Sequence, residues 1–144
     1  MTIYLDMDGT IADLYGVENW LEKLIAEDTT PYEVAKPLVD MPYLCELCKT
    51  LQSMGYKIGI ISWLAKNSTK EYDKAVRKAK KEWLHKNFTI KFDEIHIIKY
   101  GTKKNYVVSD KAGILFDDEI QNRKNWKGFS YKETEIFSVL ENLR

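Results

Sequence analysis

Two pairs of carboxylates stand where short apolar segments of the chain end. Asp6 and Asp8 are two residues apart after one such segment, and Asp117 and Asp118 are adjacent after another. A buried charge is costly unless an opposite charge or hydrogen bonds compensate for it. Each pair by itself could be an ordinary turn or helix cap, but the two together indicate a site.

The apolar segments have the length of buried strands, and their order favours a shared sheet. If both strands lie in one parallel sheet, the four carboxylates meet at its carboxyl edge, where open α/β sheets bind ligands. Carboxylates so close together repel one another, and a hard divalent cation such as Mg²⁺ relieves the repulsion. The sequence therefore predicts a site for Mg²⁺ at this edge.

The segment from Asp6 to Thr10 resembles a known motif. Its sequence Asp-Met-Asp-Gly-Thr is similar to DxDG(T/V), the first motif of the haloacid dehalogenase-like (HAD) phosphohydrolases. The three other motifs of that family follow in order: Ser62 closes the next apolar run, a lysine pair comes later, and Asp117-Asp118 is the final acidic pair. By this resemblance the chain is identified as a member of the HAD superfamily.

The resemblance implies a Mg²⁺-dependent phosphatase that works through an aspartyl-phosphate. Asp6 would attack phosphorus, while Asp8 would protonate the leaving oxygen and later activate water. Mg²⁺ would be held by the Asp6 carboxylate, by the main-chain carbonyl of Asp8 and by the pair Asp117 and Asp118. Related sites with adjacent acids favour Asp118 as the direct ligand.

The resemblance also implies which groups bind the phosphate. These are the main-chain N–H groups near Gly9, the Ser62 hydroxyl and one lysine of the pair Lys103 and Lys104. Lys104 is favoured because the run Lys-Asn-Tyr-Val-Val, which begins with it, resembles that of bacterial nucleotidase-like relatives.

Substrate class is indicated by two longer similarities. Residues 6–13, and the segment 80–98 with its Lys-Glu-Trp-Leu, resemble the 5′(3′)-deoxyribonucleotidases, which implies a small phosphorylated substrate, a nucleotide. Those enzymes have a larger helical cap, and their base-binding aromatic residues are not matched here. Tyr15, Trp20 and Trp63 either stack on a base or belong to the core.

Two other functions stay open. Basic residues dominate segment 66–86, which either contacts a phosphate backbone or simply faces water. With the short cap, this segment favours a polynucleotide 3′-phosphatase as an alternative. A non-catalytic phosphate-binding or regulatory module is the third reading, disfavoured because Asp6 and Asp8 are both present. The balanced total charge and acidic cap favour a small substrate over nucleic acid.

Strand and helix patterns alternate along the chain, which predicts an α/β, Rossmann-like fold: a mainly parallel sheet with helices on both faces. By the resemblance this is the HAD fold. Strands are expected at residues 3–5, 57–61, 92–98 and 113–116, with a weak one at Phe129. Helices are expected over residues 16–27, from 30 onward, and over 42–54, 68–86, 119–126 and 133–142.

The chain has 144 residues, which suits a single domain, residues 1–144. Residues 11–40 exceed a minimal crossover, and in the HAD family an insertion at this point forms a cap over the active site. The insertion has room for two small helices and is rich in acidic residues. A cap this small leaves the site open to a large substrate, or closed by the partner subunit of a homo-oligomer.

Composition excludes several classes of protein. The 22 basic residues balance the 22 acidic ones, so no global field draws the chain to an anionic membrane. No apolar stretch approaches the roughly 20 residues that cross a bilayer, and the N-terminus does not resemble a signal peptide, so we expect a cytoplasmic protein. Cys45 and Cys48 fall in a helical pattern and are expected to be core thiols rather than a redox or zinc site.

Overall fold

A sheet of five parallel strands forms the centre of the protein, in the order β5-β4-β1-β6-β7. The computed structural model describes all residues, 1–144. The strands are β1 (Thr2–Leu5), β4 (Lys57–Trp63), β5 (Glu94–Ile98), β6 (Ile114–Phe116) and β7 (Ser130–Tyr131). The predicted Rossmann-like α/β fold is confirmed, and the weak strand expected at Phe129 is present one residue later.

Strand β1 lies in the middle of the sheet and fixes where the acidic residues go. Leu5, the last residue of β1, is in register with Ile60 of β4 and with Phe116 of β6. Because β1 and β6 are adjacent and parallel, the carboxylates that follow them meet at one edge. The predicted convergence of four carboxylates is confirmed for Asp6, Asp117 and Asp118 but not for Asp8, whose side chain contacts Lys80 instead.

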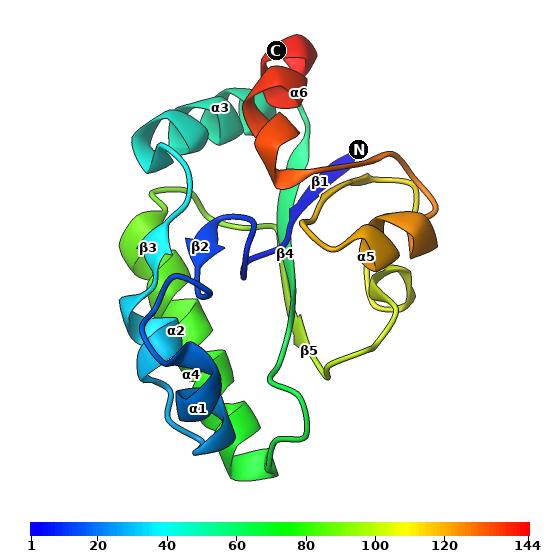
Figure 1. Ribbon diagram of the computed structural model, residues 1–144. Helices are drawn as coiled ribbons and strands as arrows, with labels where there is room; N and C mark the ends of the chain where they lie inside the picture. Colours follow the sequence, from blue (N-terminus) through cyan, green and yellow to red (C-terminus); the bar gives the residue numbers. More distant parts are fainter.

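Helices cover both faces of the sheet, but unequally (Figure 1). The helices are α1 (Trp20–Ile25), α2 (Thr30–Val34), α3 (Met41–Ser53), α4 (Lys70–Asn87), α5 (Ile120–Asn125) and α6 (Ile136–Leu143), with 3₁₀ turns η1 (Lys104–Tyr106) and η2 (Glu133–Glu135). Helices α3, α4 and α6 pack on one face, where Leu44, Trp83 and Leu140 join a core with Ile3 and Ile60. On the other face α5 and the segment around η1 cover a smaller core.

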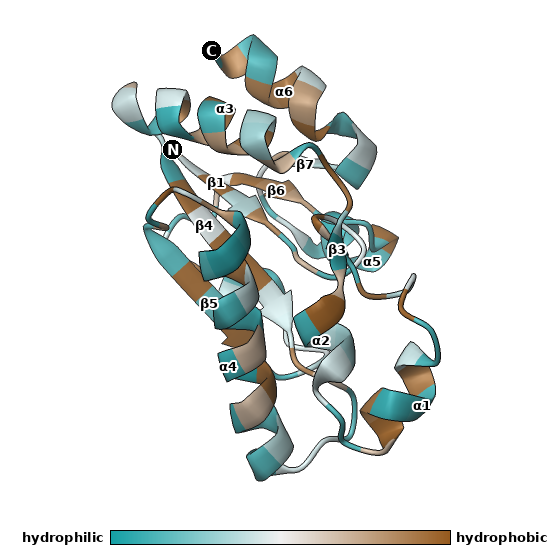
Figure 2. Ribbon diagram, turned by 90° about the vertical axis from the view of Figure 1, so that its left-hand side faces the viewer, coloured by the Kyte–Doolittle hydropathy of each residue, from teal (hydrophilic) through white to brown (hydrophobic).

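Alternation along the strands explains these two cores. Ile3 and Leu5 face the larger core, whereas Tyr4 between them packs with Leu115 and Trp126 in the smaller one. In Figure 2 much of the hydrophobic colouring lies in the sheet, while α4 is mostly hydrophilic. No helix of the chain combines the length and the apolar character that crossing a bilayer requires.

The predicted cap segment, residues 11–40, leaves the sheet through a small two-stranded ribbon. Strand β2 (Ala12–Asp13) pairs antiparallel with β3 (Lys36–Pro37), and α1 and α2 lie between them in sequence. Helix α2 packs against α4, and α1 packs against α2. Farther out, the Glu27 carboxylate accepts hydrogen bonds from the Thr69 N–H at 2.9 Å and from its hydroxyl at 2.7 Å. The segment is thus attached to the rest of the fold at more than one point.

The helix expected over residues 16–27 is wrong in length, because α1 occupies only Trp20–Ile25. Asn19 and Glu27, on either side of it, both have a φ of 58°, the left-handed backbone that interrupts a helix.

The core assignment of the cysteines is confirmed. Cys45 and Cys48 are free and buried in α3, and burial raises the pKa of the Cys48 thiol to about 12.

Candidate active site

A cluster of three carboxylates lies at the carboxyl edge of the sheet. Oxygens of Asp6, Asp117 and Asp118 lie within 4.8 Å of one another, and the group could hold a metal ion. The Lys104 ammonium donates to Asp6 Oδ1 at 2.8 Å and to Asp117 Oδ2 at 2.6 Å. The cluster therefore has three carboxylates and one buried ammonium, which contacts two of them, and this leaves an excess of negative charge.

The two adjacent acids have different surroundings. Asp117 is fully buried and accepts hydrogen bonds from Lys104 and from the Asn122 amide. Asp118 lines an open cavity and contacts no ammonium. Burial and then repulsion by Asp6 raise the pKa of both carboxyls above the ordinary aspartate value. Asp118 is therefore the acid with oxygens left to bind a cation.

Gly9 allows the loop after β1 to pass close to this cluster. Its φ is 81°, and a β-carbon at this position would lie 2.3 Å from Asp118 Oδ2. The Gly9 N–H donates to the Ala12 carbonyl, whereas no hydrogen bond within the protein uses the N–H groups of Met7 and Asp8. The main-chain N–H groups of Met7 and Asp8 are therefore unpaired within the protein, whereas that of Gly9 is paired.

Asp8 lies in a second cluster, built around a lysine of α4. The Lys80 ammonium donates to Asp8 Oδ2 at 2.8 Å, to Ser62 Oγ at 2.7 Å and to the Trp63 carbonyl at 2.7 Å. Burial raises the pKa of the Asp8 carboxyl although Lys80 acts in the opposite direction. The Lys80 ammonium thus holds both Asp8, predicted to transfer protons, and Ser62, predicted to bind phosphate.

Lys80 corrects the expectation for segment 66–86. Its side chain is 1% exposed, so it does not face water like the other basic residues of α4. The signal that could have identified it is its spacing: it follows Val76 by four residues and precedes Leu84 by four, on the apolar stripe of the helix.

The other predicted site residues lie as follows. Lys104 is buried against the acids, whereas Lys103 is exposed. Ser62 is fully buried, accepts from the Lys80 ammonium and does not line the cavity. Thr10 was not predicted, yet its hydroxyl donates to Asp6 Oδ2 at 3.0 Å and accepts from the Asp118 N–H at 3.2 Å. The catalytic and binding roles of all these residues stay predictions.

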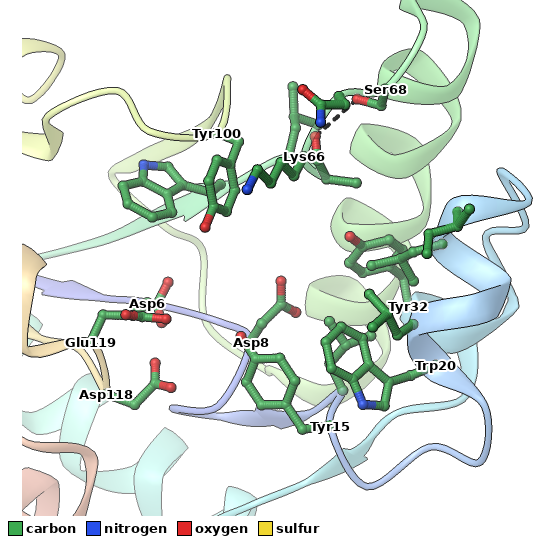
Figure 3. A pocket seen from close by; sticks show the side chains of 18 of the residues that line it. Asp6, Asp8, Tyr15, Trp20, Tyr32, Lys66, Ser68, Tyr100, Asp118 and Glu119 are labelled. Atoms are coloured by element: carbon green, nitrogen blue, oxygen red, sulfur yellow. Dashed lines mark hydrogen bonds between the residues drawn. The ribbon is translucent and has the colours of Figure 1, made fainter.

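A cavity of about 710 Å³ opens above the two clusters (Figure 3). The sequence predicts that Tyr15, Trp20 and Trp63 either stack on a base or belong to the core, and all three line the cavity. Tyr15 and Trp20 contact each other at one side, with ring centres 4.9 Å apart. Helix α1 adds aliphatic side chains, so the cavity is acidic at one end and largely apolar beyond it.

Comparison with known proteins gives a match in structure but not in sequence. No protein-family model matches the chain, and no curated protein matches it. The fold is similar to a chain in the structure of the Pnkp1/Rnl/Hen1 complex, with a TM-score of 0.54 and 16% identity. The match covers 91% of this chain and 44% of the other, so this chain spans less than half of that one. At this identity the similarity shows a common fold alone.

Proposed function

We propose that the protein is a Mg²⁺-dependent phosphatase that hydrolyses a phosphomonoester through a phosphorylated Asp6. The observation that carries the proposal is the position of the Asp6 carboxylate, which ends the central strand between the Lys104 ammonium and Asp118. Phosphoryl transfer is catalysed mainly by positioning and by neutralising charge. The resemblance of residues 6–10 to the first HAD motif supports the same chemistry.

The oxygen donors at this edge suit a hard divalent cation. Because the one ammonium of the cluster contacts Asp6 and Asp117 but not Asp118, an ion held by Asp6 and Asp118, with the main-chain carbonyl of Asp8, would remove the remaining repulsion. Asp117 would complete the acidic set while it holds Lys104 in place. When bound, Mg²⁺ would supply positive charge beside the phosphoryl oxygens.

Asp6 and Asp8 would share the bond-making and proton-transfer steps. An Asp6 oxygen attacks phosphorus as the bond to the leaving oxygen breaks, and Asp8 gives that oxygen a proton. Asp8 then takes a proton from water as the water oxygen attacks phosphorus, which releases inorganic phosphate and frees Asp6. Burial raises the pKa of Asp8, which favours the protonated form that the first step needs.

Lys80 would act as a positioning residue for both steps. Its bonds to Asp8 and Ser62 keep the carboxyl aimed at the leaving oxygen while it changes protonation state. Lys104 would bind phosphate oxygens together with the free N–H groups of Met7 and Asp8. Ser62 would reach the phosphate only from behind Lys80.

The substrate we propose is a small phosphorylated compound, a nucleotide. The aromatic side chains Tyr15, Trp20 and Trp63 around the cavity suit a base, and residues 6–13 resemble the start of the 5′(3′)-deoxyribonucleotidases. A polynucleotide 3′-phosphatase is the second candidate. It is favoured by a hollow of about 580 Å³ on the outer face of α4, lined by Lys74, Arg77, Lys78, Lys81, Glu82, His85 and Lys86.

Asp6→Asn tests the mechanism. The amide has nearly the same shape but is a poor nucleophile and a weaker metal ligand, so turnover of p-nitrophenyl phosphate with Mg²⁺ should fall by at least about 10³-fold. Circular dichroism should show an unchanged fold, and the control Asp13→Asn, outside the cavity, should retain activity. An Asp6→Asn enzyme within tenfold of wild type would contradict the aspartyl-phosphate. If the wild type turns over no phosphomonoester, the non-catalytic module remains.

A further inference from the structure

One wall of the cavity carries two cations with two aromatic rings between them. The Lys104 ammonium lies 5.6 Å from the centre of the Trp63 ring, and the Trp63 and Tyr100 ring centres are 4.9 Å apart. At the far end the Lys66 ammonium lies 6.0 Å from the centre of the Tyr100 ring. The row thus begins at the ammonium that contacts Asp6 and ends at a second positive charge.

Hydrogen bonds hold the Trp63 ring and the turn that carries Lys66. The Trp63 indole N–H donates to the Thr102 carbonyl at 2.9 Å, which sets the orientation of the ring. Lys66 projects from a tight turn, in which the Ser68 hydroxyl donates to the Ala65 carbonyl at 3.0 Å. Figure 3 shows the Lys66 side chain on the same side of the cavity as Tyr100 and pointing toward it.

The two cations differ in what they already contact. Lys104 is committed to Asp6 and Asp117, whereas Lys66 is exposed and forms no ion pair. These are the only lysine or arginine side chains that line the cavity. A ligand that reaches the far end of the row therefore meets one cation that is free to bind an anion.

We propose that the site selects phosphomonoesters whose leaving group is a flat aromatic ring system with a second anionic group. The inference rests on the proposed function, since it places the reacting phosphoryl group at Asp6 and Lys104. The ring would lie against Trp63 and Tyr100, where aromatic faces favour stacking, and the second anion would contact Lys66. Nucleoside bisphosphates have this chemistry, whereas nucleoside monophosphates lack the second anion.

Substrate competition tests the Lys66 part of the proposal. In the wild type, kcat/KM for adenosine 3′,5′-bisphosphate should exceed that for AMP about tenfold, the value of one charge-assisted contact. Lys66→Met should bring this ratio close to one, and the control Lys70→Met, on an exposed lysine outside the cavity, should preserve it. Equal kcat/KM values in the wild type, or an equal loss for both substrates in Lys66→Met, would overturn the proposal.

Tyr100→Ala tests the aromatic part. Loss of one stacking face should reduce the ratio of kcat/KM for AMP to that for glycerol phosphate by about tenfold. Tyr106→Ala is the matched control, because Tyr106 is 70% exposed and lies outside the cavity. If Tyr100→Ala leaves this ratio unchanged, the ring does not contact the leaving group.

Binding measurements separate this inference from the proposed function. Should the wild type turn over none of these esters, the proposed hydrolysis fails, but the binding row can still be tested by melting temperature. Adenosine 3′,5′-bisphosphate should then stabilise the wild type more than AMP does, and Lys66→Met should remove the difference. Equal stabilisation of the wild type by both would overturn the inference.

Discussion

Two buried lysines reach the same edge of the sheet from opposite sides, and they enter clusters of different charge. Lys104 faces a group of three carboxylates, whereas Lys80 contacts a single carboxylate, Asp8, with a hydroxyl and a carbonyl oxygen. The first cluster keeps an excess of negative charge and the second is balanced. The difference teaches that only the Asp6 cluster needs a metal ion to balance its charge. In the Asp8 cluster the Lys80 ammonium already does so.

The largest effect expected in this comparison comes from Lys80→Met, which leaves the Asp8 carboxylate without its cation. We expect kcat for an alkyl phosphate to fall by about 10²-fold, the usual contribution of a positioned acid. p-Nitrophenyl phosphate should lose less, since nitrophenolate leaves without a proton. Lys81→Met, on the exposed neighbour, is the matched control. An equal loss for both substrates would mean that Lys80 serves stability and not the position of Asp8.

A smaller effect is expected from the cation in the Asp6 cluster. Millimolar Mg²⁺ should raise the melting temperature of the wild type by roughly 5 °C, because it binds the folded state alone. Asp118→Asn should remove most of this gain, and Lys80→Met should keep it. A melting temperature that is indifferent to Mg²⁺ and to EDTA would contradict the metal assignment.

Asp118→Asn should also change how the free energy of unfolding depends on pH. Because the pKa of Asp118 is raised in the folded state by burial and by Asp6, the folded protein binds this proton more tightly than the unfolded chain does. The free energy of unfolding of the metal-free protein should therefore fall as pH rises above 3.8, the ordinary aspartate value, toward the raised pKa. Asp118→Asn should flatten this slope in denaturant titrations made in EDTA.

The smallest effect is expected on the outer face of α4. If the substrate is small, Lys74→Glu/Arg77→Glu should leave its kcat/KM nearly unchanged, and KM should depend only weakly on salt. For a polynucleotide the same change should cost more than tenfold, with a KM that rises steeply with salt through counterion release. A selective loss of oligonucleotide dephosphorylation in the double variant would favour the second candidate.

Sequence patterns identified the strands and the acids because both depend on local order. The apolar runs that precede Asp6 and Asp117 specify neighbouring parallel strands, so the meeting of these acids follows from topology. Lys80 was not identified, since a lysine within a basic segment looks solvated until the apolar stripe of the helix is considered. The approach of Tyr100 to Trp63 could not be predicted either, because it depends on how the loop after β5 folds back over the end of β4.

The length of α1 shows a second limit. Apolar spacing predicted a helix over residues 16–27, but spacing does not report the backbone angle at a single residue. Asn19 and Glu27 adopt left-handed conformations, which end the helix on both sides. The Glu27 carboxylate also accepts hydrogen bonds from Thr69, a contact between distant segments that no local pattern encodes.

The contact between Glu27 and Thr69 also restricts how far the insertion can move relative to α4. Thr69 caps the start of α4 by accepting from the Tyr72 N–H, so the far end of the insertion is anchored to the same helix that supplies Lys80. Because the β2–β3 ribbon holds the other end, the insertion is attached at both ends and cannot swing about a single hinge. Tyr15 and Tyr100 also line the cavity and are 46% and 48% exposed, so they remain accessible while the insertion is held in place.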